Sequence, residues 1–329
     1  PFQCRLVAHL RAIDRDVWEW FASGRVRGEH VQAARLSLLR SAYRIDRETQ
    51  PALYELAERA AAGLELDQPI TLYQAQQAHD GLNAGIVWIP DEAHIVLHGP
   101  VADRLTGPEL LSIFGHELAH AVLWTTDRGK YHVMGRILNS LAADPQAGPA
   151  HGRTLQLYNL YTEIYCDRGA VIASGDLEVA VSALVKVNAG VSEADARSFL
   201  AQAEEVLAAD PAPSEADGHP ESVIRARCLQ LWCEQGDEAE PAVTDLIEGR
   251  LSLSRLHLLQ QIELAELTRN LVLHLLAPRW MRSEANLAHA RMFFEDGRLP
   301  AIDASIRPFT VTAADFDPQL GDVLCYVRL

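Results

Sequence analysis

The chain of 329 residues is long enough to bury a sizeable core, as one large domain or two modest ones. A hydrophobic content of 48% and a charged content of 22% are ordinary for a globular protein and exclude wholesale disorder. The formal net charge of −16 disfavours binding to nucleic acid or to anionic lipid, because a surface this negative repels phosphate groups.

Three features of the sequence concern its location. No apolar run approaches the roughly 18 residues that a membrane-spanning helix needs, so we expect no membrane insertion. Residues 1–14 lack the long apolar core of a secretion signal. Five scattered cysteines include no C-x-x-C pair, which argues against a disulfide framework and against a cysteine zinc site. The expected location is therefore cytoplasmic.

The first part of the chain, to about Gly63, is expected to be helical, with apolar spacing typical of helices over 31–43 and 52–62. Short runs with a composition typical of β-strands then follow at 70–73, 85–89 and 94–98. A turn-like interval separates the last two runs, and this arrangement predicts a β-hairpin.

The remainder is expected to be mainly helical. Thr106-Gly-Pro-Glu109 has the form of a capping box and predicts the start of a helix that runs to about Trp124. A loop rich in Pro and acidic residues is expected at 208–220, and irregular or β structure at 302–329. Further helices are expected over 153–174, 176–188, 254–276 and 283–295.

The helix that begins near Thr106 carries the pattern H-E-x-x-H, as His116-Glu117-Leu118-Ala119-His120. Histidines four residues apart lie on one helical face, so both imidazoles can point at one metal ion. Glu117 projects beside them, where it can accept a proton from metal-bound water. Alternatively, the two histidines are buried, hydrogen-bonded residues of an apolar helix.

Catalytic zinc needs a third protein ligand. The longer zincin pattern fails, because Leu123 and Thr126 stand where a glycine and a third histidine belong. His132 and His151 lie around a region that resembles a loop, and we expect both to be surface residues.

Glu163 is better placed as the third ligand, because it lies centrally on the next long helix. Asp167 follows one turn later on the same face, where it can hydrogen-bond a ligand imidazole from behind. Without this partner helix the two carboxylates would be an ordinary solvated pair.

The order of these motifs resembles the HtpX-type zinc peptidases and the related CAAX prenyl endopeptidases. Asn83-Ala84 precedes a strand, and L-T-x-x-E-L, HELAH and E-x-x-x-D-R follow in turn. His219-Pro220 followed by Arg225 is similar to a late H-P-(x)₄-R element of that family. The matching pieces cover about 72–232.

The resemblance implies an α+β, zincin-like fold, with mostly helices and a small, mainly antiparallel sheet whose edge faces the cleft. It also implies a Zn²⁺ ion held by His116, His120 and Glu163, with Glu117 as the general base.

Four further residues receive roles only through this resemblance. His219 would donate to the oxyanion of the tetrahedral intermediate, although a loop histidine without function is the alternative. Arg225 would pair with a carboxylate behind the site, Asp167 being the candidate. Asn83 and Ala84 would lie beside the edge strand that aligns the substrate backbone.

The chain also departs from the family. Its members usually carry transmembrane helices, so a membrane or prenylated substrate is not transferred to this chain. Cys166 stands where the family usually has alanine.

We therefore expect an N-terminal helical region at 1–65, a zinc metallopeptidase domain at 66–235 and a mostly helical C-terminal region at 236–329. The expected function is a zinc-dependent endopeptidase acting on a protein or peptide. Three alternatives stay open: a latent protease whose flanking regions cover the cleft until a regulatory partner moves them, a zinc-stabilised interaction module, and a metal-free helical scaffold with a chance HELAH.

Overall fold

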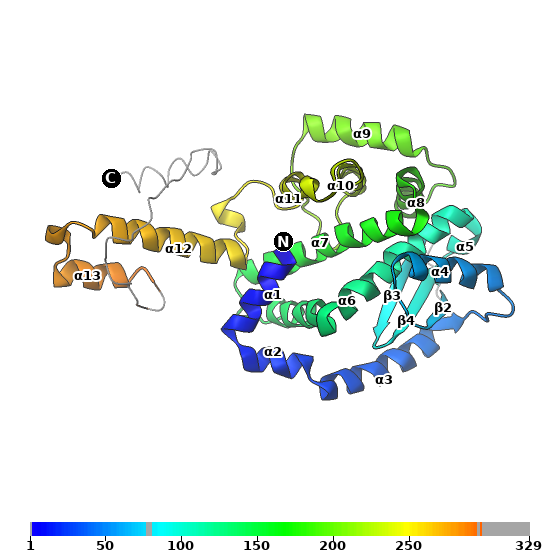
Figure 1. The fold of residues 1–329 in the computed structure, drawn as a ribbon, viewed down its shortest axis with the longest axis horizontal. Helices are drawn as coiled ribbons and strands as arrows, with labels where there is room; N and C mark the ends of the chain where they lie inside the picture. Colours follow the sequence, from blue (N-terminus) through cyan, green and yellow to red (C-terminus); the bar gives the residue numbers. More distant parts are fainter. Residues whose placement is uncertain (1, 77–80, 295–296, 298–329) are drawn as a thin grey trace. The chain divides into compact units, whose positions relative to one another are not determined.

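A computed structural model describes residues 2–76, 81–294 and 297 of the chain, which are mainly helical with one small sheet (Figure 1). The chain divides into two units, Pro1–Asp144 with Leu155–Gly249, and Pro145–Thr154 with Arg250–Leu329. Among the described residues, none of the helices combines the length and the apolar character that crossing a membrane requires. The prediction for 302–329 lies outside the described residues.

The sheet belongs to the first unit and has the strand order β1-β2-β4-β3. Its strands are β1 (Ala42–Arg44), β2 (Ile70–Ala75), β3 (Asn83–Ile89) and β4 (Glu92–His98). The predicted hairpin is confirmed, since β3 pairs antiparallel with β4. β1 is also antiparallel to β2, but β2 runs parallel to β4, so the sheet is mixed. This order leaves β3 at an edge of the described sheet.

The prediction of a helix over 31–43 is wrong at its end. Helix α3 (Gly24–Ser41) stops before Tyr43, which lies in β1. Ala42 is in register with Ala75 of β2 and Tyr43 with Gln74. This pairing joins segments more than 30 residues apart in the sequence, and such tertiary pairing overrides local helical spacing.

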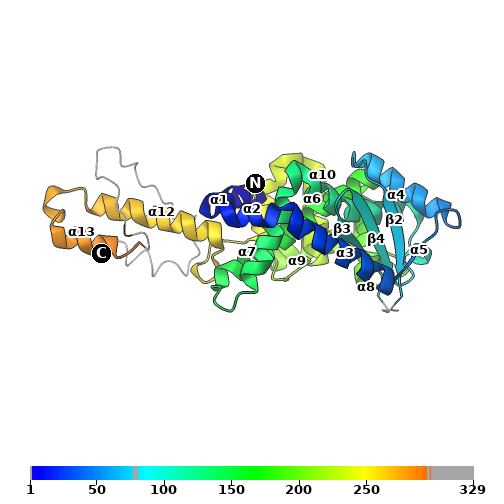
Figure 2. The same ribbon diagram turned by 90° about the horizontal axis from the view of Figure 1, so that it is seen from below.

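The two faces of the sheet pack against different helices. Leu72, Ile95 and Leu97 point into the main core, together with residues of α4 (Pro51–Gly63) and of the long helix α6 (Gly107–Ala142). Neighbouring residues of the same strands, such as Tyr73 and Val96, point the other way and pack with Leu38 of α3. This alternation is the two-residue period of a strand. Figure 2 shows α3 running beside the sheet.

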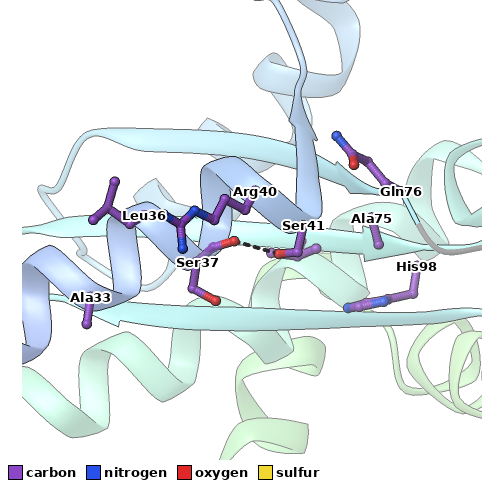
Figure 3. Close-up of a pocket in the computed structure, with 9 residues that line it drawn as sticks. Ala33, Leu36, Ser37, Arg40, Ser41, Ala75, Gln76 and His98 are labelled. Carbon is purple, nitrogen blue, oxygen red and sulfur yellow. Dashed lines mark hydrogen bonds between the residues drawn. The ribbon is translucent and has the colours of Figure 1, made fainter.

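A cavity of about 650 Å³ lies between α3 and the sheet face that packs against it (Figure 3). Leu36 and Arg40 of α3 line it from one side, and Ala75, Gln76 and His98 from the sheet. None of these residues belongs to the predicted metal site.

Helix α6 begins at the predicted capping box. The Thr106 side chain accepts from the backbone N–H of Glu109, and the Glu109 carboxylate accepts from that of Thr106. The helical geometry breaks at Thr126–Gly129, where Asp127, Arg128 and Gly129 all have positive φ angles. The first part of α6 thus ends close to Trp124, the predicted end of the helix. The helical stretch that resumes after Gly129 was not predicted.

Helix α7 (Pro149–Ser174) starts four residues before its predicted beginning. It is followed by α8 (Leu177–Ala189), which has Asp176 as N-cap and Gly190, at φ +68°, as C-cap, as predicted. Helices α9 (Ala196–Ala209) and α10 (Ser222–Gln235) were not predicted, while the loop between them agrees with the expectation for 208–220.

The remaining helices are short or lie at the ends of the described chain. In the first unit they are α1 (Phe2–Ile13), α2 (Arg15–Ala22), α5 (Val101–Arg104), the 3₁₀ helix Gly236–Ala239 and α11 (Glu240–Ile247). In the second unit they are the 3₁₀ helix Leu253–Arg255, α12 (Leu258–Leu275), the 3₁₀ helix Arg279–Met281 and α13 (Glu284–Arg291). Helices α12 and α13 lie within the predicted ranges 254–276 and 283–295.

Candidate metal centre

The candidate site forms where α6 and α7 cross at two glycines. A Cβ atom added to Gly115 would lie 2.4 Å from Cβ of Ala173 and 2.6 Å from the carbonyl oxygen of Gly169. A Cβ added to Gly169 would lie 2.4 Å from Cβ of Ala119. Only glycine therefore permits this close approach of the two backbones. The crossing brings one face of α7 onto the HELAH segment of α6.

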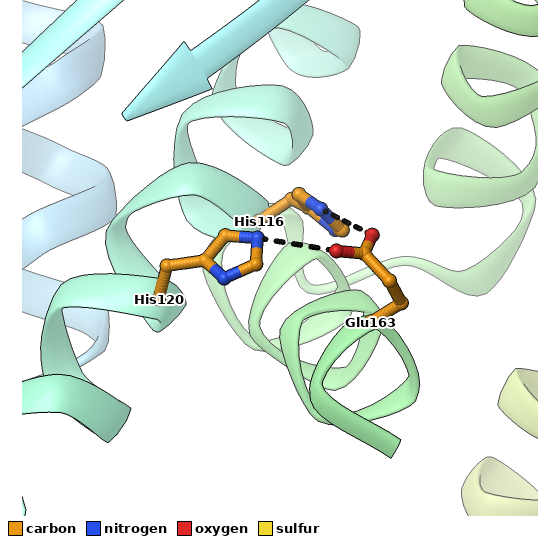
Figure 4. Close-up of side chains that lie close together, drawn as sticks. All are labelled: His116, His120 and Glu163. Atoms are coloured by element: carbon orange, nitrogen blue, oxygen red, sulfur yellow. Dashed lines mark ion pairs between the residues drawn. The ribbon is translucent and has the colours of Figure 1, made fainter. Parts of the chain in front are cut away.

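His116, His120 and Glu163 converge at this crossing (Figure 4). Their candidate ligand atoms all lie within 4.8 Å of one another. Nε2 of His116 is 3.4 Å from Oε2 of Glu163, and Nε2 of His120 is 3.6 Å from Oε1. The side chains are 11%, 12% and 8% exposed, so the cluster is shielded from bulk water. The alternative of a solvated carboxylate pair on α7 is wrong.

The pKa values of these three groups are shifted in different directions. Burial would lower the pKa of His116, but its hydrogen bonds with the carboxylates of Asp167 and Glu163 raise it to about 10. Burial and the neighbouring His116 lower the pKa of His120 to about 4. Burial would raise the pKa of Glu163, but the imidazoles of His116 and His219 hold it well below its usual value. The centre therefore combines an ionised carboxylate with imidazoles in two different states.

Asp167 lies behind His116 and joins it to α10. Oδ1 of Asp167 is 3.0 Å from Nδ1 of His116, which leaves Nε2 directed toward Glu163. Arg225 donates to both oxygens of Asp167, from Nε at 2.8 Å and from Nη2 at 2.5 Å. All three side chains are buried. The geometry is the one predicted from the sequence, a carboxylate that fixes the orientation of an imidazole.

Glu117 lies in the wall of a cavity of about 610 Å³ that His116 and His120 also line. The residue is 7% exposed, and burial raises the pKa of its carboxyl group. Its carboxylate forms no hydrogen bond with any described residue. A carboxyl group with a raised pKa beside a candidate metal site has the properties that a general base requires.

The edge strand β3 lines the same cavity. Asn83 is exposed at the start of the strand and accepts from the backbone N–H of Ala84, which is buried. Gly85 and Ile86 continue this wall. An exposed strand edge can bind an extended peptide by adding a strand. The predicted substrate residues therefore lie at the cavity, and their role stays a prediction.

His219 stands at the mouth of the site, with its side chain 68% exposed. Its Nδ1 atom lies 2.7 Å from Oε2 of Glu163, at ion-pair distance. The imidazole is thus adjacent to the metal-ligand candidates, as expected from the sequence. One of its two nitrogens already faces Glu163, which leaves Nε2 for the predicted contact with an oxyanion.

The residues fit a divalent metal ion. Two imidazoles and one carboxylate are the protein ligands of several catalytic zinc sites. Oε2 of Glu163 is buried among the imidazoles, with Nε2 of His116 at 3.4 Å and Nδ1 of His219 at 2.7 Å, so a cation that replaced their protons would find a carboxylate oxygen already in place. A metal ion binds the neutral imidazole, and its binding would therefore release the proton that the two carboxylates hold on His116.

Two histidines differ from the sequence expectation. His132 is half-buried rather than on the surface, and its ring contacts that of Trp124 with 6.1 Å between centroids. His151 is also half-buried, in the first turn of α7. Neither belongs to the His–His–Glu group.

Two aromatic or polar residues of α6, Ser112 and Trp124, are among those of the cavity wall that were not predicted from the sequence. The Trp124 ring lies 5.2 Å from that of His120. Ser112 and Trp124 both lie on the stripe that His116 and His120 define, one turn before and one turn after them. The four-residue spacing was the signal that could have identified them.

Comparison with known proteins gives one informative similarity. No family model matches the chain, and no solved structure matches it. Over 156 residues the chain is 32% identical to "Plastoglobule-localized metallopeptidase 48, chloroplastic" of Arabidopsis thaliana. The aligned region covers 42% of this chain and 44% of that protein, so the chain spans less than half the length of its relative. This similarity and the buried His–His–Glu group together support a metal-dependent peptidase.

Proposed function

We propose that this chain is a zinc-dependent endopeptidase, related to the HtpX-type and CAAX prenyl endopeptidases, that hydrolyses peptide bonds in a protein or peptide substrate. The observation that supports it most strongly is the convergence of His116, His120 and Glu163 within 4.8 Å, with Glu117 in the wall of the adjoining cavity. A purely structural zinc site has no need of a carboxyl group beside an open metal position.

The proposed chemistry assigns a task to each residue. His116, His120 and Glu163 would hold the zinc ion, which when bound lowers the pKa of a water molecule and polarises a carbonyl group. Glu117 accepts the proton of the attacking water and then delivers it to the leaving amine. His219, at the mouth of the cavity, offers an N–H group to the developing oxyanion. The edge of β3 holds the substrate backbone in an extended conformation.

The test is the Glu117→Gln variant, assayed for zinc content and for cleavage of a peptide library with a chelator control. We expect about one zinc ion per chain in both proteins and loss of most turnover in the variant, because the amide cannot accept the proton. A fully active variant would contradict the role of Glu117. Zinc content that stays unchanged in Glu163→Ala would contradict the third ligand.

A further inference from the structure

The cavity at the candidate metal centre continues past the centre toward α8. Helix α6 lines it with Ile113 before the two histidines and with Trp124 after them, so the centre lies between two ends of the cavity. At the Trp124 end a second cavity, of about 380 Å³, adjoins it and has polar residues such as Arg136 and Asn159 in its wall. The Ile113 end is bounded by α8 and has a different chemical character.

One face of α8 closes the Ile113 end. Ala180, Leu184 and Val187 line the cavity, and their spacing of four and three residues places them on one helical face. Ala180 and Leu184 are buried, whereas Val187 is half-buried, as is Ile113 of α6. Val187 and Ile113 both pack against the main core. Because they also line the cavity, part of their apolar surface faces it.

The described residues of α6 and α8 that bound this end are uncharged. On α8 the one polar residue of the lining is Asn188, whose side-chain amide donates to the backbone oxygen of Leu184 at 3.0 Å. An apolar wall stabilises a bound apolar side chain by removing it from water. The titratable side chains of the described lining are His98 of β4 and those at the metal centre, namely His116, Glu117, His120, Asp167, His219 and Arg225.

The edge strand β3 determines which substrate side chains reach this end. Ala84 and Ile86 are two residues apart, and both belong to the sheet face that packs in the main core. A peptide that pairs with the edge of β3 places its side chains alternately on the two faces of the sheet. Every second side chain therefore points toward α6 and α8, where Ile86, Ile113 and Val187 line the cavity.

We infer that the Ile113 end of the cavity is a subsite for one large apolar side chain beside the cleaved bond, with Ile113 and Val187 as its specificity-determining residues; this rests on the proposed peptidase function. The substrate class is an extended peptide segment that carries a residue such as leucine, methionine or phenylalanine at that position. An acidic or basic residue there would lose its hydration without gaining a partner, so the subsite rejects it.

The experiment measures peptide binding to the zinc-loaded Glu117→Gln protein by calorimetry, so that turnover does not interfere. The peptides are blocked at both ends and differ only in one central residue, which is Leu, Ala, Asp or Lys between small neutral neighbours. We expect the Leu peptide to bind about tenfold more tightly than the Ala peptide, because leucine removes more apolar surface from water. The Asp and Lys peptides should bind no more tightly than the Ala peptide.

Variants of α8 assign the effect to the subsite. Val187→Asp should reduce the preference for Leu over Ala to less than about twofold and make the Lys peptide bind more tightly than the Leu peptide, because the ammonium gains an opposite charge. Val191→Asp is the matched control, because Val191 is 40% exposed just beyond α8 and is not among the described residues that line the cavity. It should keep the full preference for Leu.

Val187→Thr serves if Val187→Asp does not fold, as judged by thermal unfolding. Threonine has nearly the shape of valine but adds a hydroxyl group, so the preference for Leu over Ala should fall to about threefold.

Equal binding of the Leu and Ala peptides, or no binding of either, overturns the inference. A preference for Leu that the folded Val187 variant leaves intact also overturns it, because the apolar contact would then lie elsewhere. Hydrolysis assays of the wild-type protein separate the two proposals. Cleavage of the Leu and Ala peptides with equal kcat/KM removes the subsite and keeps the peptidase. A Val187-dependent preference in binding without any cleavage removes the peptidase and keeps the binding site.

Discussion

At the scale of single residues, Glu163 and Asp167 of α7 lie one turn apart but have different roles. Glu163 faces the Nε2 atoms of both histidines, where a metal ion would bind. Asp167 faces Nδ1 of His116 and is itself held by two donors of Arg225. Glu163 would thus supply a ligand oxygen, and Asp167 fixes which nitrogen of His116 faces the ion.

Asp167→Asn should weaken zinc binding about 10- to 100-fold, because the amide no longer orients and polarises His116. It should also destabilise the fold by about 3–5 kcal/mol, since buried Arg225 would lose the carboxylate that accepts from two of its nitrogens and would keep only the longer contact with Glu163, at 3.9 Å. Zinc competition against a chelator and chemical unfolding measure the two effects.

The exposed Asp103 of α5 gives the control, because Asp103→Asn changes the same functional group at an exposed position. This variant should behave as wild type in both assays. Wild-type zinc affinity in Asp167→Asn would show that the contact with His116 has no influence on the metal.

At the scale of elements, the crossing of α6 and α7 is the feature that assembles the centre. Gly169→Ala places a methyl group 2.4 Å from Cβ of Ala119 and 2.9 Å from the backbone oxygen of Gly115. Backbone cannot yield as a flexible side chain does, so the helices must separate. We expect destabilisation of about 1–3 kcal/mol, as for other overpacked sites, together with weaker zinc binding because Glu163 moves with α7.

Gly152→Ala on the same helix is the matched control. A Cβ atom at that position meets no atom of the described part of the chain within 4 Å. Alanine should there be neutral or slightly stabilising, because it forms helix more readily than glycine. Equal stability and equal zinc affinity of the Gly169→Ala variant and wild type would show that the crossing tolerates a larger separation.

A second element-scale feature joins the start of α6 to α8. The buried Glu109 carboxylate accepts from the backbone of Thr106 at 2.8 Å, from Ser182 at 2.7 Å and from Lys186 at 2.9 Å. Burial would raise its pKa, but these hydrogen bonds and the Lys186 ammonium lower it below the ordinary value of 4.5. The folded state therefore prefers ionised Glu109 more strongly than the unfolded state does.

This difference predicts a pH dependence of stability. The contribution of Glu109 is fully present above the ordinary pKa, where both states are ionised. It is lost as the pH falls through the lower folded pKa, because the unfolded state binds a proton first. The difference in melting temperature between wild type and Glu109→Gln should therefore narrow as the pH falls below the ordinary pKa of 4.5. Calorimetric scans measure it, and a constant difference would contradict the lowered pKa.

At the scale of the whole molecule, a metal ion that binds only the folded chain must stabilise it. Zinc at about 100 times its dissociation constant should add about 2.7 kcal/mol to the free energy of unfolding. Differential scanning calorimetry with zinc and with a chelator measures this shift. His116→Ala should abolish the shift, and an unchanged melting temperature on adding zinc to wild type would contradict the metal centre.

Much of the fold was predictable because it depends on short-range chemistry. The capping box at Thr106 and the Asp176 and Gly190 caps of α8 involve residues within a few positions of one another. The β3–β4 hairpin depends on a short turn in the same way. Helices α9 and α10 were missed. In the structure, α8, α9 and α10 share one small core, so tertiary packing supports them in addition to local propensity.

For the candidate site, local spacing is enough to place His116 and His120 on one helical face with Glu117 between them. Tertiary packing brings Glu163 to them, since that contact depends on two glycines 54 positions apart, at a helix crossing too close for a Cβ atom. Tertiary packing also brings Arg136 and Asn159 to the wall of one cavity and pairs β1 with β2. Such contacts join segments that are distant along the chain, and packing, rather than local spacing, selects them.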